Sequence, residues 1–198
     1  MNVDPVSVDP VSVAVAFAVA LALFLVFFLG VTTFNLVVAL RQRADKAWAN
    51  IEVSLQQRHD QLPSLVNAVK GLMGFEQAVL EEVTRQRARW SPDDPPPAQA
   101  AASDGTSAAV RTLFATVEAY PDISSQENVL ELQGQIARLE EMIADRRELY
   151  NDSVYRYNTT IRQVPGVLLA PVLRWRQREF FEARPEDREK PDVSLLGT

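Results

Sequence analysis

The chain has 198 residues, a formal charge of −6, no cysteine, one histidine and seven glycines. The absence of cysteine excludes disulfides, thiolate zinc sites, iron–sulfur clusters and cysteine nucleophiles, and a single histidine excludes sites that need two imidazoles within the chain. Few glycines disfavour phosphate-binding loops and hairpin-rich sheets, and the net acidity argues against nucleic acid, so we expect no nucleic-acid partner.

An uncharged segment separates Asp9 from Arg41, and its residues 13–31 are all apolar or glycine. A helix of these 19 residues rises about 28 Å, close to the roughly 30 Å hydrocarbon core of a bilayer. The preceding residues include two aspartates and no basic residue, and the apolar run exceeds the roughly 7–15 residues of a signal-peptide core. We therefore predict a transmembrane helix over 11–33 rather than a cleaved signal peptide.

The charges that flank this segment predict its orientation. Every Lys and Arg lies beyond residue 40, beginning with Arg41, Arg43 and Lys46, whereas the N-terminal tail 1–10 has none. Cytoplasmic flanks of membrane spans are enriched in Lys and Arg. We therefore expect a single-pass protein of the cell membrane, with the tail 1–10 outside and the chain after residue 40 in the cytoplasm.

Beyond the anchor, apolar residues recur every three or four positions, which is typical of α-helices rather than of strands. Four such stripes extend over residues 36–55, 62–83, 110–117 and 129–164. Pro63 fits the first turn of a new helix or a kink, and Tyr120-Pro121 ends the third helix. We therefore predict an all-α fold, in which the transmembrane helix is followed by an antiparallel four-helix bundle of long helices over residues 34–165.

Two segments depart from this helical pattern. Residues 90–107 carry four prolines between positions 92 and 97, so we expect an exposed linker there, with a proline-rich recognition peptide as the alternative. The tail 166–198 mixes apolar and aromatic residues with arginines, which is typical of a membrane interface. The alternative is that these side chains cap the core of the bundle. The residues expected at the interface are Arg174, Trp175, Arg176, Arg178, Phe180 and Phe181.

Several segments of the chain resemble, in order, blocks of the LemA family. They are residues 34–71, FATVEAYPDI at 114–123, RRELYNDSVYRYNTTIRQVP at 146–165 and FFEAR at 180–184. The resemblance implies an N-terminal anchor and a bundle of long helices but no established reaction, and some relatives are associated with membrane organisation. It also implies structural roles for Asn35, Arg41, Trp48, His59, Asp60, Pro63, Tyr120, Pro121, Tyr150, Asn151, Tyr157, Asn158 and Pro165.

His59 is the one imidazole and fits a general base or a metal ligand. No serine, cysteine or second histidine stands close to it in the sequence to complete a catalytic set. We therefore favour a hydrogen-bonded residue at the junction of the first two predicted helices, with Asp60 capping the second.

Two further polar groups lie on the fourth predicted helix. One is acidic and consists of Glu140, Glu141, Asp145 and Glu148. A di-iron bundle needs histidines beside such carboxylates, so a solvated, salt-bridged face is the favoured interpretation. The other is a Tyr-Asn pair that recurs after seven residues, at 150–151 and 157–158. It fixes the helix register through hydrogen bonds or, as the alternative, binds a partner.

These patterns predict a non-catalytic protein that needs no cofactor or metal. We expect a membrane-anchored helical scaffold that has the lipid bilayer as a partner, self-associates as a homo-oligomer and organises or remodels the membrane. The alternative is a signalling adaptor, which docks an unknown protein partner at the cytoplasmic face of the membrane.

Overall fold

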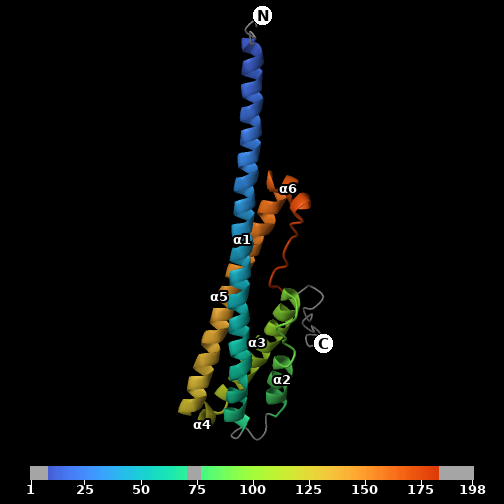
Figure 1. Cartoon of the computed structure of the whole chain (residues 1–198). Coiled ribbons are helices and arrows are strands. Elements are labelled where there is room, and N and C mark those ends of the chain that lie inside the picture. The colour runs from blue at the N-terminus through green and yellow to red at the C-terminus, as the bar shows by residue number, and fades with distance from the viewer. Residues whose placement is uncertain (1–8, 71–76, 183–198) are drawn as a thin grey trace, which may run out of the picture.

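The computed structural model describes residues 9–70 and 77–182, which form helices and turns without a strand (Figure 1). The helices are α1 (Pro10–Lys70), α2 (Gln77–Arg87), α3 (Pro96–Glu118), α4 (Pro121–Ser124), α5 (Glu127–Arg162) and α6 (Gly166–Leu173). This confirms the predicted all-α class. Residues 1–8 of the expected outer tail and 183–198 of the C-terminal tail lie outside the described residues.

The long helix α1 has 61 residues, measures about 90 Å and projects far beyond the rest of the molecule (Figure 1). Its C-terminal half packs along α5, while α2 and α3 form a second pair and α2 also contacts α1. The chain descends α1, returns along α2, descends α3 and returns along α5. Because α2 has 11 residues, the arrangement differs from the predicted bundle of four long helices.

Pro63 lies inside α1, and no new helix begins there. Proline disturbs a helix because it lacks an N–H donor and its ring crowds the preceding turn. Leu62 and Leu65 on either side of it are at most 1 % exposed, so packing against the core outweighs this local cost. The first predicted stripe and the first part of the second therefore belong to one helix, and residues 77–83 of the second lie in α2.

The expected exposed linker over 90–107 is wrong for its second half, because α3 begins at Pro96. Prolines are tolerated in the first turn of a helix, where the backbone N–H groups have no helical partner. Gln99 and Ala100 are completely buried, so this part of the segment belongs to the core. A prediction from the proline content alone therefore extends the linker between α2 and α3 too far toward the C-terminus.

The Gln99 side chain orders the turn that precedes α3. Its Nε2 donates hydrogen bonds to the carbonyls of Pro92 and Asp94 at 3.1 and 2.9 Å. Its Oε1 accepts a hydrogen bond from Trp90 Nε1 at 3.1 Å. One buried amide thus satisfies three polar groups of a tight connection.

The buried side chains form three clusters along α1. The largest lies at the end farthest from the apolar half of α1 and includes Leu62, Leu65, Val69, Val83, Val110, Leu113, Val117, Val129 and Ile136. A middle cluster contains Ala44, Ile51, Leu55, Ala100, Ile143, Tyr150, Val154 and Phe181. The smallest consists of Val37, Tyr157 and Ile161 and lies nearest the apolar half of α1. The core therefore ends where the free part of α1 begins.

Candidate functional site

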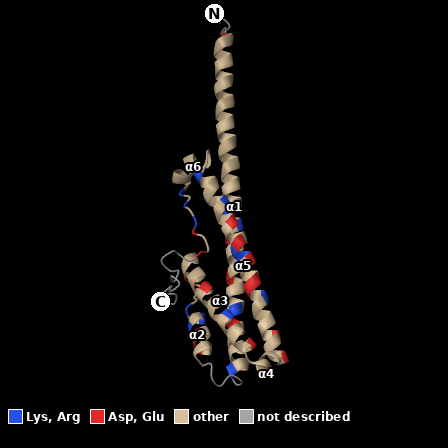
Figure 2. Cartoon of the chain, turned by 180° about the vertical axis from the view of Figure 1, so that it is seen from behind, with Lys and Arg blue, Asp and Glu red and all other residues tan. Residues whose placement is uncertain are grey.

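The N-terminal half of α1 is apolar on every face. Its large side chains from Val11 to Val31 are 41–70 % exposed, and Figure 2 shows no charged residue on this part of the helix. Within the described ranges, α1 is the one helix that is long and apolar enough to cross a membrane. Such a surface is strongly unfavourable in water, which indicates a membrane-associated protein.

A second apolar element, α6, lies beside α1 close to the point where the free half of α1 begins (Figure 1). Residues 163–173 carry no charge, and Leu168 and Val172 are 67 % and 78 % exposed. The Trp175 ring, shortly after α6, packs against Phe34 of α1 with centroids 6.1 Å apart. Two apolar elements from distant parts of the sequence therefore meet at one level of the molecule.

The tight connection between α5 and α6 depends on Gly166. A Cβ atom at this position would lie 2.2 Å from the carbonyl oxygen of Thr160. Neither this carbonyl nor the Ile161 Cα at 3.3 Å can move without displacing the backbone of α5. The close approach of the two helices, and with it the position of α6 against α1, therefore requires glycine.

The residues predicted at the membrane interface do not all lie on the surface. Arg174 and Arg176 are exposed, Trp175 is half-buried and Phe180 is 37 % exposed, so their contact with lipid stays a prediction. Phe181 is completely buried, and its predicted place at the interface is wrong. Its ring packs into the middle core cluster, which agrees with the alternative prediction that side chains of this tail cap the core of the bundle.

The extended residues 175–182, called the strap below, follow α5 in the opposite direction. Asn158 Nδ2 donates to the carbonyl of Arg178, and its Oδ1 accepts from the Arg178 N–H, both at 2.9 Å. Asn151 makes the same pair with Phe181: its Oδ1 accepts from the N–H at 2.8 Å and its Nδ2 donates to the carbonyl at 3.4 Å. The asparagines therefore order the strap, and not the register between helices.

The two tyrosines of the repeated pair are buried beside the strap. The Tyr150 hydroxyl donates to the carbonyl of Glu179 at 2.9 Å, and the Tyr157 ring lies 5.9 Å below the guanidinium of Arg178. Burial raises the pKa of Tyr150 to about 12. The phenol therefore stays protonated, and remains a donor, throughout the neutral range.

A pocket of aromatic and cationic groups holds Phe181. The rings of Trp48 and Phe181 are 5.8 Å apart, and Trp48 also packs on Tyr150 at 5.3 Å. Arg147 lies 5.4 Å above the Phe181 ring and donates through Nε to its carbonyl at 3.0 Å. Arg147 also pairs with Asp104 of α3 at 2.7 Å, so the strap is connected to three helices.

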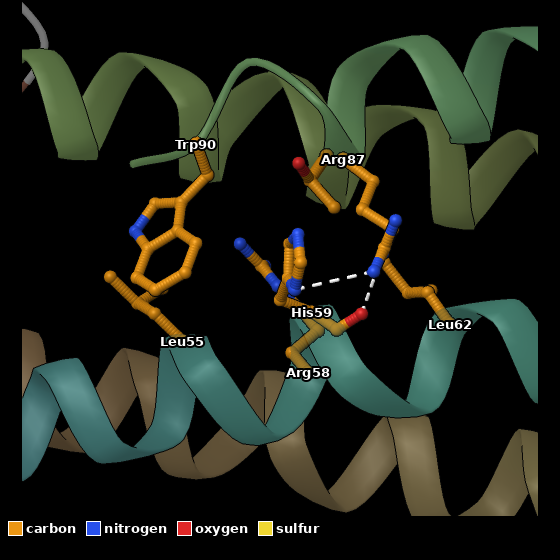
Figure 3. Close-up of a pocket in the computed structure, with 7 residues that line it drawn as sticks. Leu55, Arg58, His59, Leu62, Arg87 and Trp90 are labelled. Atoms are coloured by element: carbon orange, nitrogen blue, oxygen red, sulfur yellow. Dashed lines mark hydrogen bonds between the residues drawn. The ribbon is translucent and has the colours of Figure 1, made fainter. Parts of the chain in front are cut away.

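His59 lies in the C-terminal part of α1 and lines a small hollow together with Arg87 and Trp90 (Figure 3). Arg87 donates to the carbonyl of His59 at 2.7 Å, and its second nitrogen lies 3.4 Å from His59 Nδ1. The same Nδ1 is 3.3 Å from Asp60 Oδ1, and the imidazole packs on Trp90 at 5.4 Å. Ring contact and hydrogen bonds account for His59 as a structural residue.

The predicted capping role of Asp60 is wrong because α1 continues past it. Its carboxylate instead accepts hydrogen bonds from Gln56 Nε2 at 2.9 and 3.0 Å. The hydrogen bond from Gln56, followed by that of His59, lowers the pKa of Asp60. Asp60 therefore stays ionised on the surface of the helix.

A buried arginine, which the sequence interpretation missed, connects three helices. Arg58 of α1 is 3 % exposed and donates to Glu140 Oε1 of α5 at 2.8 Å. It also donates to the hydroxyls of Ser103 and Ser107 on α3, at 3.0 and 2.9 Å. Ser107 donates in turn to the other oxygen of Glu140, which closes the network. A small hydroxyl every four residues on α3 is the one signal that could have indicated such a partner.

This network corrects the prediction for the acidic residues of α5. Glu140 is only 25 % exposed, and its carboxylate compensates the buried guanidinium of Arg58 instead of pairing with arginines of its own helix. Glu141, Asp145 and Glu148 are exposed, as predicted. In the described part of the chain, no three His, Cys, Asp or Glu side chains lie close enough together to hold a metal ion.

The remaining family-motif residues lie at element boundaries or on exposed positions. Asn35 and Arg41 are exposed on α1 near the end of its apolar half. Tyr120 precedes α4, Pro121 is its first residue and Tyr120 packs against the largest core cluster. Pro165 directly precedes α6. These residues therefore shape the fold rather than a common reactive centre.

Comparison with known proteins agrees with this geometry. The LemA family model matches residues 47–195. Magnetosome proteins MamQ 1 and MamQ 2 of Paramagnetospirillum magneticum (strain AMB-1) are each 33 % identical over 84 residues, which are 42 % of this chain and 31 % of the relative. MamQ of Magnetospirillum gryphiswaldense is 31 % identical over 84 residues. The match thus spans less than a third of the length of these relatives.

Proposed function

Because this chain belongs to the LemA family, we propose that it is a non-catalytic scaffold anchored in the cell membrane, which self-associates and organises or remodels that membrane. The observation that carries the proposal is the meeting of two exposed apolar elements, the N-terminal half of α1 and the helix α6, at one end of a charged helical rod. The magnetosome relatives support a place at a membrane.

In this proposal α1 spans the bilayer and leaves it near Phe34. Arg41 and Arg43 follow two turns later, at a depth where their side chains can reach lipid phosphates. The rod then lies in the cytoplasm, since basic flanks favour that side. At this level, the exposed leucine and valine side chains of α6 enter the headgroup region of the same leaflet.

Remodelling follows from the position of α6. A short apolar helix inserted beside an anchor adds area to one leaflet and none to the other. A single copy displaces little lipid, whereas copies that assemble side by side add their effects. Self-association is therefore the step that would convert an anchored rod into a membrane-organising scaffold.

Labelling α6 in the full-length protein tests the lipid contact. The chain has no cysteine, so Val167→Cys introduces a single site for a polarity-sensitive fluorophore. After reconstitution into vesicles, we expect a blue-shifted emission at this site. Leu130→Cys, which is 53 % exposed at the start of α5, is the matched control and should report water. A water-like emission at both sites would contradict insertion of α6.

The mass of the reconstituted protein tests self-association. We expect oligomers in detergent and in vesicles, with a fraction that grows with the ratio of protein to lipid. A monomer under all of these conditions would contradict the scaffold. The combined Leu168→Ser and Val172→Ser variant should keep the helical content but lose vesicle deformation, because both side chains are exposed.

The adaptor is the second candidate, and a hollow between α3 and α5 favours it. Charges of both signs line this hollow, namely Asp104, Arg111, Glu140, Arg147 and Glu148. Such a surface can bind a polar protein segment through complementary charges. Proximity labelling separates the candidates, since an adaptor enriches one soluble partner in constant ratio and a scaffold enriches mainly itself.

A further inference from the structure

We propose that the strap groove on α1 and α5 also binds the strap of a second copy, so that anchored neighbours exchange straps. This inference rests on the proposed self-association and supplies its contact. The strap groove is the surface of α1 and α5 formed by Asp45, Trp48, Asn151 and Asn158. It binds both the backbone and two side chains of the strap. Each copy of the chain carries the matching ligand.

Two asparagines, seven residues apart on α5, form hydrogen bonds with the backbone of the strap. Seven helical residues, from Asn151 to Asn158, rise about 10.5 Å, and three extended residues, from Arg178 to Phe181, span about 10 Å. The two amides therefore meet the strap in register, each with an accepted N–H and a donated hydrogen bond to the same residue.

Side-chain contacts make the groove selective for an Arg-x-x-Phe segment. Arg178 pairs with Asp45 of α1 and lies over the Tyr157 ring, while Phe181 fills the pocket lined by Trp48. The two residues between them point outward: Glu179 is exposed and Phe180 is 37 % exposed. Two buried anchor side chains separated by more exposed residues are typical of docked linear segments.

The strap is joined to α6 by a strained hinge. Arg174 has φ 54°, in the left-handed region, where glycine usually ends a helix. A non-glycine residue is disfavoured there because its Cβ atom crowds the following carbonyl oxygen. Trp175 packs on Phe34, so only residues 176 and 177, which span at most about 7 Å, separate this contact from Arg178 in the strap. A strap can therefore reach a neighbour only when the two rods lie side by side.

Exchange keeps every contact of the groove and can relieve the hinge. A swapped dimer therefore loses no hydrogen bond relative to two separate copies, and the association entropy is the main cost. Anchors hold the copies in one orientation on a surface, which raises their effective concentration and lowers this cost. Dense membranes thus favour exchange, and dilute membranes favour the strap on its own groove.

Two single-cysteine versions of the full chain test the exchange. Tyr155→Cys lies on α5 and Phe180→Cys on the strap, and both positions line the hollow beside the groove. The versions carry tags of different size and are reconstituted together into phosphatidylcholine and phosphatidylglycerol vesicles. A short bis-maleimide then links them. The double-cysteine chain, which links within itself, shows that the linker spans the distance.

We expect a mixed cross-linked dimer whose yield rises with the ratio of protein to lipid. Combined Asn151→Leu and Asn158→Leu should lower the yield at least ten-fold, while the exposed control Asn67→Leu should leave it unchanged. Circular dichroism checks that each variant keeps its helices. Energy transfer between labelled cysteine-free copies measures self-association separately. If energy transfer is present but mixed dimers are no more frequent than in the asparagine variant, strap exchange is overturned and self-association stands. If energy transfer is absent, both are overturned.

Discussion

The two halves of α1 belong to one uninterrupted helix yet present opposite surfaces. From Val11 to Val31 the large apolar side chains are 41–70 % exposed, whereas Ile51, Leu55 and Leu62 in the second half are at most 1 % exposed. Figure 2 shows charges on the second half alone. One continuous helix is therefore suited to lipid in its first half and to water in its second. The difference teaches that apolar side chains need to be buried by other helices only where water surrounds the helix.

The largest expected effect comes from placing two arginines on the apolar half of α1 and comparing them with two arginines at matched exposed positions elsewhere. Val19→Arg with Val26→Arg places two charges on the lipid half, at a cost of roughly 5–7 kcal/mol of insertion free energy. Val53→Arg with Leu149→Arg makes the same change at similarly exposed positions, one on the second half of α1 and one on α5, which packs along it. We expect the first variant to lose its alkali-resistant membrane fraction and the second to keep it. Equal fractions for both would refute the division.

Removing the buried arginine tests the polar partners of the water half. Arg58→Ala removes the charged partner of Glu140 and leaves it only the hydrogen bond from Ser107, so we expect a loss of about 3–5 kcal/mol in the free energy of unfolding. Arg156→Ala breaks an exposed pair with Asp152 and should cost less than about 1 kcal/mol. Urea unfolding of the full chain in detergent, followed by circular dichroism, measures both. Similar losses would show that the network is not buried in solution.

Alanine at two helical glycines, Gly166 of α6 and Gly134 of α5, tests the junction between the halves of α1, with Gly134 as the control away from it. Gly166→Ala forces a methyl group into the Thr160 carbonyl and should cost about 1–3 kcal/mol of stability while separating Trp175 from Phe34. Gly134→Ala meets only the Arg138 side chain, at 3.6 Å, and should stabilise α5 by about 0.5–1 kcal/mol. Thermal unfolding with tryptophan emission measures both. Stabilisation by both alanines would contradict the close approach.

The smallest effect concerns Tyr150, which is buried where the strap meets the rod. Its pKa is raised to about 12, so the protonated phenol stabilises the fold fully below pH 10, and this contribution is lost as the pH rises through 12. Tyr150→Phe removes the hydrogen bond to Glu179, at a cost of about 1 kcal/mol at pH 8.

The difference in stability between wild type and Tyr150→Phe should therefore shrink as the pH rises from 10 to 12. Urea titrations at several alkaline pH values measure this difference and cancel the titration of other groups. A constant difference over this range would show that Tyr150 ionises as freely in the fold as in the unfolded chain.

The sequence predicts what depends on local periodicity. The apolar run of α1, the all-α class and nearly the whole of α5 follow from composition and a three-to-four-residue spacing. The fourth stripe, over 129–164, coincides closely with α5, which spans Glu127–Arg162. These signals suffice because neighbouring residues on one helix determine them.

The remaining features depend on contacts between distant residues, which one sequence does not display. Pro63 stays helical because of partners on other helices, and Arg58 is buried because two serines and Glu140 from α3 and α5 surround it. The strap has no periodicity of its own, so its place on α5 follows from contacts with distant residues, such as its hydrogen bonds to Asn151, Asn158 and Tyr150. Phe181 consequently looked like an interfacial residue although it is part of the core.

Cysteine labelling from one side of the membrane tests the central claim most directly. Single Asn2→Cys, Leu23→Cys and Glu141→Cys variants of the full chain are exposed to an impermeant maleimide in intact cells and after permeabilisation. We predict labelling of the first variant in intact cells, of the third only after permeabilisation, and of the second in neither case. Labelling of Glu141→Cys in intact cells, or of Leu23→Cys in intact membranes, would contradict an anchor with a cytoplasmic rod.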